Sequence, residues 1–148
     1  MGKLNVIMGR LTVVHLTWKR HLQRQIVPYG ITLKQLYLLR QLARNDYLYP
    51  ADIAEMLFCD RPTATVVIKN MEKRGWLCRT RDPDNKKRIR VSITNEGRQK
   101  RQELQSARGD QHLTSFDPLS CFSSDETETL EKLLQRLQEH LSQLRGYS

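Results

Sequence analysis

Two groups of side chains in the middle of the chain have the chemistry needed to contact a nucleic acid. The first recurs at helical spacing and comprises Thr63, Val66, Lys69, Asn70 and Lys73. The Asn70 carboxamide can pair with an adenine edge, a lysine ammonium can reach guanine or phosphate, and a methyl group of Val66 can contact thymine. The second group is the run Lys86-Lys87-Arg88, whose adjacent cations repel one another unless an anion meets them. We therefore expect DNA to be the partner of both groups.

The first group needs a helix that turns one face inward and the other outward. Asp60 suits the N-cap, Pro62 suits the first turn, and Gly75 ends the helix. The apolar set at the same spacing is Ala64, Val67, Ile68 and Met71. A step of about 100° per residue then places the polar group on the opposite face. Arg61, Pro62 and Thr65 complete the expected interface at the helix N-terminus, where free N–H groups attract phosphate. The alternative is an ordinary solvated helix face.

The elements around this helix predict a winged helix-turn-helix lobe over residues 31–97. A short helix from Pro50 to about Leu57 precedes it, and the tight turn Phe58-Cys59-Asp60 joins the two. Residues 76–81 and 89–93 are rich in strand formers, and Asp82-Pro83-Asp84-Asn85 between them is typical of a turn. The cationic run would lie at the tip of this hairpin, where it could meet a phosphate backbone. The alternative is a hairpin whose edge is merely charged.

Helices are predicted on both sides of the lobe, so the fold class is mainly α with a small β-hairpin wing. An apolar stripe over residues 4–25 indicates a long first helix that ends near Pro28, and a Thr32/Gln35 capping box begins a helix over residues 32–44. Residues 95–113 are expected to form a connecting helix with shallow burial at Leu104 and Ala107. A Ser123/Glu126 capping box then precedes leucines at heptad-like spacing over residues 130–144.

The two terminal stripes favour a homodimer. The chain is expected to be a single domain, residues 1–148, in which residues 1–30 and 110–148 form dimerisation helices. Two terminal helices that cannot cover each other would expose a large apolar patch, and symmetric pairing would bury it. Pairing would also set two recognition helices roughly 34 Å apart, as a palindromic operator requires. The alternative is that both stripes are ordinary intramolecular core.

Charge follows the same plan. The chain has 25 Lys and Arg against 16 Asp and Glu, a net charge of +9. Residues 60–109 carry 14 basic and 6 acidic side chains, whereas residues 110–148 carry 3 and 7. Positive charge therefore peaks on the proposed binding element, which favours a polyanionic partner.

Lys3, Asn5 and Arg10 interrupt the apolar N-terminus, so neither a signal peptide nor a membrane span is expected, and the cytoplasm is the default compartment.

Other kinds of site have little support. The cysteines are three in number and lack a CxxC or Cys/His pattern, so no metal and no cofactor is expected. The four histidines are scattered and no catalytic motif occurs, which argues against an enzyme. Cys59 is the best candidate for a redox-sensing thiol, because it precedes a helix N-terminus beside Arg61. Its more common role would be that of a small buried hydrophobe.

A small-molecule effector is a weaker expectation. His15, Trp18, Tyr29 and Tyr37 lie where the first two helices could meet the DNA-binding lobe. Aromatic walls suit a flat aromatic or lipophilic ligand. The alternative is that these four side chains only pack the junction.

The chain resembles the MarR family of winged-helix transcriptional regulators over nearly all of its length. Met71-Glu72-Lys73-Arg74-Gly75-Trp76-Leu77 matches the family's Leu-Glu-Lys-x-Gly-apolar-apolar run, and Val91-Ser92-Ile93-Thr94-x-x-Gly97 matches its Val-x-Leu-Thr-x-x-Gly ending. The resemblance implies a homodimer on a palindromic operator, often a repressor that a phenolic or lipophilic ligand releases, or one that responds to cysteine oxidation. Two positions depart from the pattern. Asn85-x-Lys87 replaces the wing's usual Asp-x-Arg, so that Arg88 is expected to substitute, and Phe58 stands where the family often has a small residue or Gly.

The leading hypothesis is thus a sequence-specific, effector-responsive DNA-binding regulator. One alternative is a winged-helix module whose basic face binds an acidic protein. Another is a thiol-based redox sensor on the same DNA-binding scaffold.

Overall fold

The computed structural model describes residues 2–109 and 116–144, which fall into two compact units, residues 1–113 and 114–148. The first contains α1 (Lys3–Ile26), the 3-10 helix η1 (Val27–Tyr29), α2 (Leu33–Leu42), α3 (Pro50–Met56), α4 (Arg61–Lys73), β1 (Leu77–Arg81), β2 (Ile89–Ile93) and α5 (Asn95–Gly109). The second contains α6 (Ser124–Ser142). Among these residues, no helix is long and apolar enough to cross a membrane.

The first two helices begin and end where local signals predict. α1 gives way to η1 at Val27, one residue before Pro28, and Gly30 follows η1 in the left-handed region with a φ of 67°. The Thr32 capping box is present, since Thr32 Oγ1 accepts from the Gln35 N–H at 3.2 Å and Gln35 Oε1 accepts from the Thr32 N–H at 3.1 Å. Local sequence is sufficient here because each bond joins residues three positions apart.

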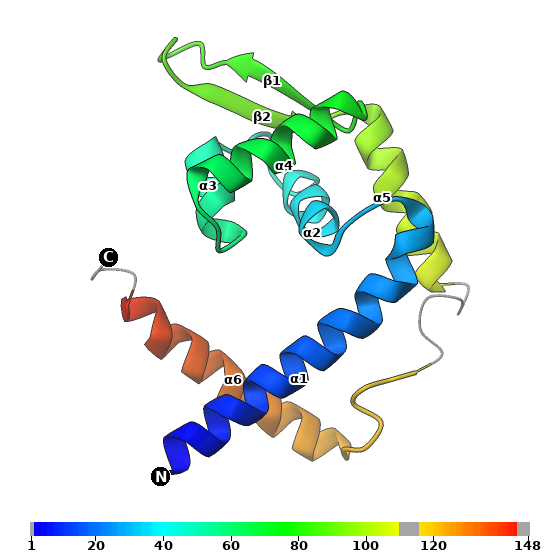
Figure 1. Cartoon of the computed structure of the whole chain (residues 1–148), viewed down its shortest axis with the longest axis vertical. Coiled ribbons are helices and arrows are strands. Elements are labelled where there is room, and N and C mark those ends of the chain that lie inside the picture. The colour runs from blue at the N-terminus through cyan, green and yellow to red at the C-terminus, as the bar shows by residue number, and fades with distance from the viewer. Residues whose placement is uncertain (1, 110–115, 145–148) are drawn as a thin grey trace. The chain divides into compact units, whose positions relative to one another are not determined.

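α2 lies at the centre of the lobe and is buried on more than one face. Leu36 and Leu39 are buried as predicted, and so are Leu38 and Leu42, which a single stripe would leave outside. The wider burial arises because α2 packs against α4, α5 and β2 as well as α1 (Figure 1). Burying several large aliphatic side chains is the main source of stability for a lobe of this size.

The helix-turn-helix has the predicted caps and the predicted inward face. Asp60 Oδ1 accepts from the Thr63 N–H at 2.8 Å, which satisfies a free donor at the start of α4. Ala64, Ile68 and Met71 are buried, and Val67 is half-buried against the core. Gly75 ends the helix with a φ of 76°.

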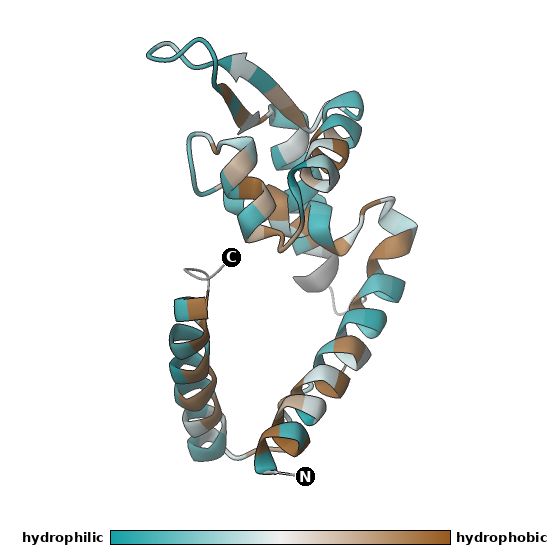
Figure 2. Cartoon of the chain, turned by 60° about the vertical axis from the view of Figure 1, so that its left-hand side comes forward, coloured by the Kyte–Doolittle hydropathy of each residue, from teal (hydrophilic) through white to brown (hydrophobic). Residues whose placement is uncertain are grey.

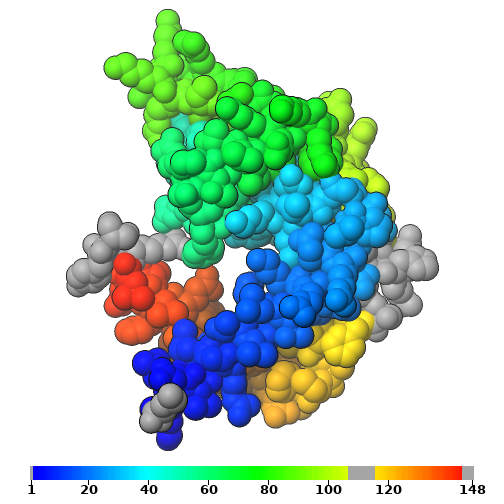
Figure 3. All heavy atoms as spheres, in the orientation of Figure 1, coloured from blue at the N-terminus to red at the C-terminus, as the bar shows by residue number. Residues whose placement is uncertain are grey.

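The hairpin is antiparallel, with Leu77 paired to Ile93, Arg79 to Val91 and Arg81 to Ile89. Leu48 pairs with Val91 on the other edge of β2, through N–H···O bonds of 2.9 and 2.8 Å. Val91 is fully buried, whereas Ile89 is exposed because the distal part of the hairpin projects beyond the core (Figure 3). The base of the hairpin is therefore packed against the lobe, whereas its tip projects away from the core.

One junction joins the end of α4, the hairpin and the start of α5. The Thr94 N–H donates to the Trp76 carbonyl at 3.0 Å, and Thr94 Oγ1 donates to the Gly75 carbonyl and accepts from the Gly97 N–H at 3.1 Å. A Cβ added at Gly97 would overlap the Trp76 carbonyl oxygen and lie 2.8 Å from a carbon of Ile93. The family's terminal glycine thus has a physical reason, namely close approach of two backbones.

Trp76 is the largest side chain at this junction. It is 9% exposed, and the Arg74 guanidinium and the Lys100 ammonium lie 4.9 and 5.7 Å from its ring centroid. Cations over an aromatic face attract it electrostatically, so these two side chains add to the apolar packing that buries the ring in the core.

α5 corrects one expectation. We expected shallow burial along this helix, but Leu104 is only 1% exposed, because it packs into the core cluster that contains the buried leucines of α2. The side chain of Ala107 lies outside the described residues, as does the predicted continuation of the helix to residue 113.

α1 and α6 each expose apolar side chains. On α1 these include Leu4, Val6, Ile7, Met8, Val13, Val14 and Leu16, and on α6 they are Leu133, Leu134 and Leu141. Figure 2 shows the hydrophobic segments repeating along both helices. α6 begins with the predicted capping box, in which Ser123 Oγ accepts from the Glu126 N–H at 3.2 Å and Glu126 Oε1 accepts from the Ser123 N–H at 3.1 Å.

Candidate nucleic-acid interface

The predicted DNA-reading group forms one exposed face of α4. Its exposed members are Arg61, Pro62, Thr63, Val66, Lys69, Asn70 and Lys73. Thr65 differs, because it is half-buried and its hydroxyl donates to the Arg61 carbonyl at 2.9 Å. Its side chain is therefore occupied within the first turn, and the remaining residues provide the polar surface.

The acidic residue of α4 is neutralised from the wing. Glu72 accepts from Arg79 of β1 through two hydrogen bonds, the longer of which joins Arg79 Nη2 to Glu72 Oε1 at 3.4 Å. Lys69 and Lys73 have no acidic partner within 4.0 Å in the part of the chain that the structure describes. The face of α4 thus keeps its positive charge, which would favour a polyanion.

The tip of the wing is a tight turn with two free lysines and one held arginine. Asn85 Oδ1 accepts from the Lys87 N–H at 3.1 Å, and the Asn85 carbonyl accepts from the Arg88 N–H at 2.8 Å. Lys86 and Lys87 are exposed. Arg88 is exposed too, but its guanidinium carbon lies 3.6 Å from the centroid of the Tyr49 ring. The three cations therefore differ in their contacts, since only Arg88 lies over an aromatic ring.

Sequence reasoning missed a polar cluster at the base of the wing. Asp82 is 3% exposed and accepts from the Tyr49 hydroxyl, from the Asp84 N–H at 2.8 Å and from Arg90 Nη2 at 3.3 Å. The Tyr49 hydrogen bond, followed by that from the Asp84 N–H, lowers the Asp82 pKa to about 2. The sequence suggested only a turn at Asp82, because Tyr49 lies 33 positions away.

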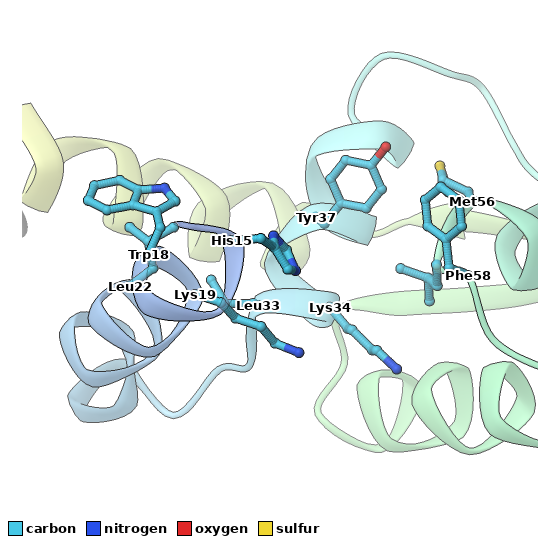
Figure 4. A pocket seen from close by; sticks show the side chains of 10 residues that line it. His15, Trp18, Lys19, Leu22, Leu33, Lys34, Tyr37, Met56 and Phe58 are labelled. Atoms are coloured by element: carbon cyan, nitrogen blue, oxygen red, sulfur yellow. The ribbon is translucent and has the colours of Figure 1, made fainter. Parts of the chain in front are cut away.

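Three of the four predicted effector residues line one cavity of about 610 Å³ in the first unit. His15, Trp18 and Tyr37 lie on its wall, whereas Tyr29 packs against the core instead. No local sequence pattern marks the other residues that line this cavity, which are Lys19, Leu22, Leu33, Lys34, Met56, Leu57 and Phe58. Figure 4 shows that the cavity draws its walls from α1, from α2 and from the end of α3 with the turn that follows it.

Phe58 connects this cavity to the helix-turn-helix. It is the only described non-glycine residue with a positive φ, at 53°, and its side chain is 83% exposed. A bulky residue in the left-handed region is strained, which is common at functional sites. Phe58 lies two residues before Asp60, the N-cap of α4, so the cavity wall and the start of the reading helix share one turn.

Cys59, the predicted redox thiol, is half-buried and packs against the core. That environment matches a small hydrophobe, the alternative considered for it. Cys78 and Cys121 are exposed. Residues 2–109 and 116–144 contain no group of three or more His, Cys, Asp or Glu side chains placed to hold a metal ion.

Known proteins share both sequence and fold with this chain. The sequence profile of the MarR family matches residues 31–89. YybA of Bacillus subtilis, an uncharacterized HTH-type transcriptional regulator, is 34% identical over 106 residues, which are 72% of this chain and 68% of YybA. PecS of Dickeya dadantii, also an HTH-type transcriptional regulator, is 27% identical to this chain, and the aligned region covers 92% of this chain and 82% of PecS.

Solved structures agree with this assignment. The transcriptional regulator SlyA has a TM-score of 0.77 at 25% identity, with 93% of this chain and 94% of SlyA covered. A mutant of E. coli MarR complexed with operator DNA has a TM-score of 0.73 at 24% identity, with 93% and 99% covered, and shows the same fold. The chain therefore belongs to the MarR family of winged helix-turn-helix transcriptional regulators.

Proposed function

We propose that this protein is a homodimeric repressor that binds a palindromic operator through α4 and the wing, and that a small ligand releases it. The observation that carries the proposal is the exposed polar face of α4, where Lys69 and Asn70 stand opposite the buried Met71. Side chains that reach base edges give specificity, whereas cations on the phosphate backbone give affinity. The relatives are named as transcriptional regulators rather than as enzymes, and such a regulator would act in the cytoplasm.

The roles of α4 and the wing can be separated by salt. A gel-shift series on genomic fragments selected by the protein should show that Lys87→Ala weakens binding to every sequence and reduces the salt slope by about 1. Asn70→Ala should instead relax the preference at one base pair, at a cost of roughly 1–3 kcal/mol. Lys132→Ala on α6 is the matched control for charge, because Lys132 already pairs with Glu128 at 2.6 Å. Wild-type affinity and slope in both test variants would show that these contacts are absent.

Dimerisation is supported by the apolar side chains that α1 and α6 expose. Such patches are rarely left open in water, and a second copy of the chain offers the same surface. Leu134→Glu should convert the dimer to a monomer in sedimentation experiments and lower operator affinity, because the two half-sites no longer bind together. Lys132→Ala makes the same change in charge on the opposite face of α6 and should leave the dimer intact. A wild-type chain that sediments as a monomer contradicts the proposal.

Effector binding is supported by the cavity of about 610 Å³ between α1, α2 and the Phe58 turn. Its aromatic walls suit a flat ring, and Lys19 and Lys34 on its lining suit an anionic group on that ring. Isothermal titration calorimetry with benzoate and with neutral benzamide tests both features. We expect benzoate to bind more tightly, Trp18→Ala to weaken both probes, and Lys34→Ala to remove only the preference for the anion. Absence of heat from both probes would argue against this ligand class.

A further inference from the structure

We propose that Tyr49 is the positioning residue of the wing, and that its ring holds Arg88 in place to meet the DNA backbone while its hydroxyl holds Asp82. The inference rests on the proposed function, since it assumes that the wing contacts DNA. It concerns a residue outside the wing itself, at the start of α3.

The backbone of Tyr49 is fixed from both sides. Its neighbour Leu48 exchanges two hydrogen bonds with Val91 of β2, and its own N–H donates to Asp52 Oδ2 at 3.2 Å. Tyr49 therefore stands at a point where the lobe and the base of the wing are joined. The Tyr49 side chain therefore starts from a backbone that is fixed relative to the lobe, and wing residues that contact this side chain are positioned relative to the lobe as well.

The hydroxyl of Tyr49 belongs to a polar cluster around the buried Asp82. It donates to the buried Asp82 carboxylate, which also accepts from Arg90. The Arg90 guanidinium lies 4.0 Å from the Tyr47 ring centroid, and the Tyr47 and Tyr49 rings meet edge to face at 5.4 Å. The hydrogen bond to Asp82 raises the pKa of the Tyr49 hydroxyl, which therefore stays a donor at neutral pH. Asp82 is occupied on several sides, so the orientation of the Tyr49 ring is set by a buried partner.

The face of the Tyr49 ring meets Arg88. A separation of 3.6 Å between the guanidinium carbon and the ring centroid is about one van der Waals thickness, so the guanidinium plane must lie against the ring. Stacking uses the flat face of a guanidinium and leaves its N–H donors, which lie in the plane, directed away from the ring. Arg88 is exposed and has no acidic partner among the described residues. The ring thus orders a cation without neutralising it.

Ordering Arg88 before DNA arrives has a functional consequence. A free arginine loses rotamer freedom when it binds a phosphate, and one that is already stacked loses less. By contrast, Lys87 is held only through its backbone N–H, which donates to Asn85 Oδ1, and neither Lys86 nor Lys87 has an acidic partner within 4.0 Å among the described residues. Arg88 is accordingly the wing cation whose affinity for phosphate depends on a second residue, and that residue is Tyr49.

A double-mutant cycle on the full-length protein tests this coupling, with the selected operator fragment and an unrelated duplex as probes. Arg88→Ala should weaken binding to both duplexes by about tenfold. Tyr49→Leu should weaken binding nearly as much, and the double variant should be no worse than Arg88→Ala alone. Tyr49→Phe keeps the ring but loses its hydrogen bond to Asp82, so it should recover only part of the affinity lost in Tyr49→Leu. Tyr47→Leu removes the ring under Arg90 instead and should add to Arg88→Ala independently.

Each failure has a distinct meaning. Additive losses for Tyr49→Leu and Arg88→Ala would overturn the positioning role while leaving the wing contact in place. Wild-type binding by Arg88→Ala would overturn this proposal by removing the contact between Arg88 and DNA, whereas wild-type binding by both Arg88→Ala and Lys87→Ala would contradict the wing contact of the proposed function. A measurement on the wild-type protein avoids variants that fail to fold, because NMR should show Arg88 side-chain protons shifted upfield by the Tyr49 ring. Unshifted resonances would overturn the proposal.

Discussion

The reading helix and the wing carry similar charge, but the lobe holds them by different forces. α4 packs against the lobe through the buried side chains of Ala64, Ile68 and Met71. The wing is paired at its base to Leu48 and is held further out by the Asp82 cluster and by two arginines stacked on tyrosines. One element depends on apolar packing and the other on hydrogen bonds and charge. We therefore expect α4 to respond to lost volume and the wing to respond to protonation.

The largest expected effect is on the apolar anchor of α4. Met71→Ala removes a fully buried side chain and should destabilise the lobe by about 3 kcal/mol in denaturant unfolding. Lys69→Ala on the opposite face of the same helix is the control, and it should leave stability within about 0.5 kcal/mol of wild type. Equal losses in the two variants would erase the distinction between the faces.

The second-largest effect is expected at the junction of α4, the hairpin and α5. Gly97→Ala places a Cβ against the Trp76 carbonyl and Ile93, so it should cost about 2 kcal/mol and disturb helix and wing together. Gly9→Ala is the matched control, because Gly9 is also helical and nothing lies within 4 Å of its added Cβ. Thermal unfolding of both variants measures the difference, and an undisturbed Gly97→Ala protein would show that the close approach is absent.

A smaller effect is expected at the start of α4. Asp60→Ala removes the side chain that accepts from the Thr63 N–H and should lower the melting temperature by about 4 °C. Asp60→Asn retains an acceptor and should recover most of the loss. A full loss in the asparagine variant would show that charge, rather than the cap, is what matters there.

The last expected effect is confined to acid and to the wing. The pKa of Asp82 in the folded protein is about 2, below its ordinary value of 3.8. Its contribution to stability is therefore complete above pH 3.8 and is lost as the pH falls towards 2. The pKa of Asp60 is also lowered, so the informative quantity is wild type minus Asp82→Asn. That difference should shrink on acidification below pH 3.8 and stay constant near neutrality, and thermal unfolding across this range measures it.

The parts of the fold that sequence predicts are those with local causes. Asp60 and Gly75 bound α4, and the Thr32 and Ser123 capping boxes begin α2 and α6, because each signal lies within a few positions of what it controls. Periodicity also separated the buried Ile68 from the exposed Lys69. These features need no knowledge of tertiary contacts.

The features that the sequence does not predict depend on contacts between residues that lie far apart in the chain. Asp82 reads as a turn residue, yet its hydroxyl donor is Tyr49. Leu104 is isolated in a charged helix, and its burial depends on where the helix packs against α2. The phenylalanine at position 58 does not itself predict a left-handed backbone, since bulky residues rarely adopt one, and the only signal is that the family often has a small residue or Gly there. The cavity similarly gathers residues from α1, α2 and the Phe58 turn.

The covered ring of Trp76 gives the molecule a built-in spectroscopic reporter. The chain has two tryptophans, and they lie in different surroundings. Trp18 is half-buried on the wall of the cavity, whereas Trp76 is 9% exposed beneath Arg74 and Lys100. Fluorescence from Trp18 alone, in a Trp76→Phe protein, should follow ligand entry. Fluorescence from Trp76 alone, in a Trp18→Phe protein, should stay constant on ligand entry and change when the junction of α4, the wing and α5 opens.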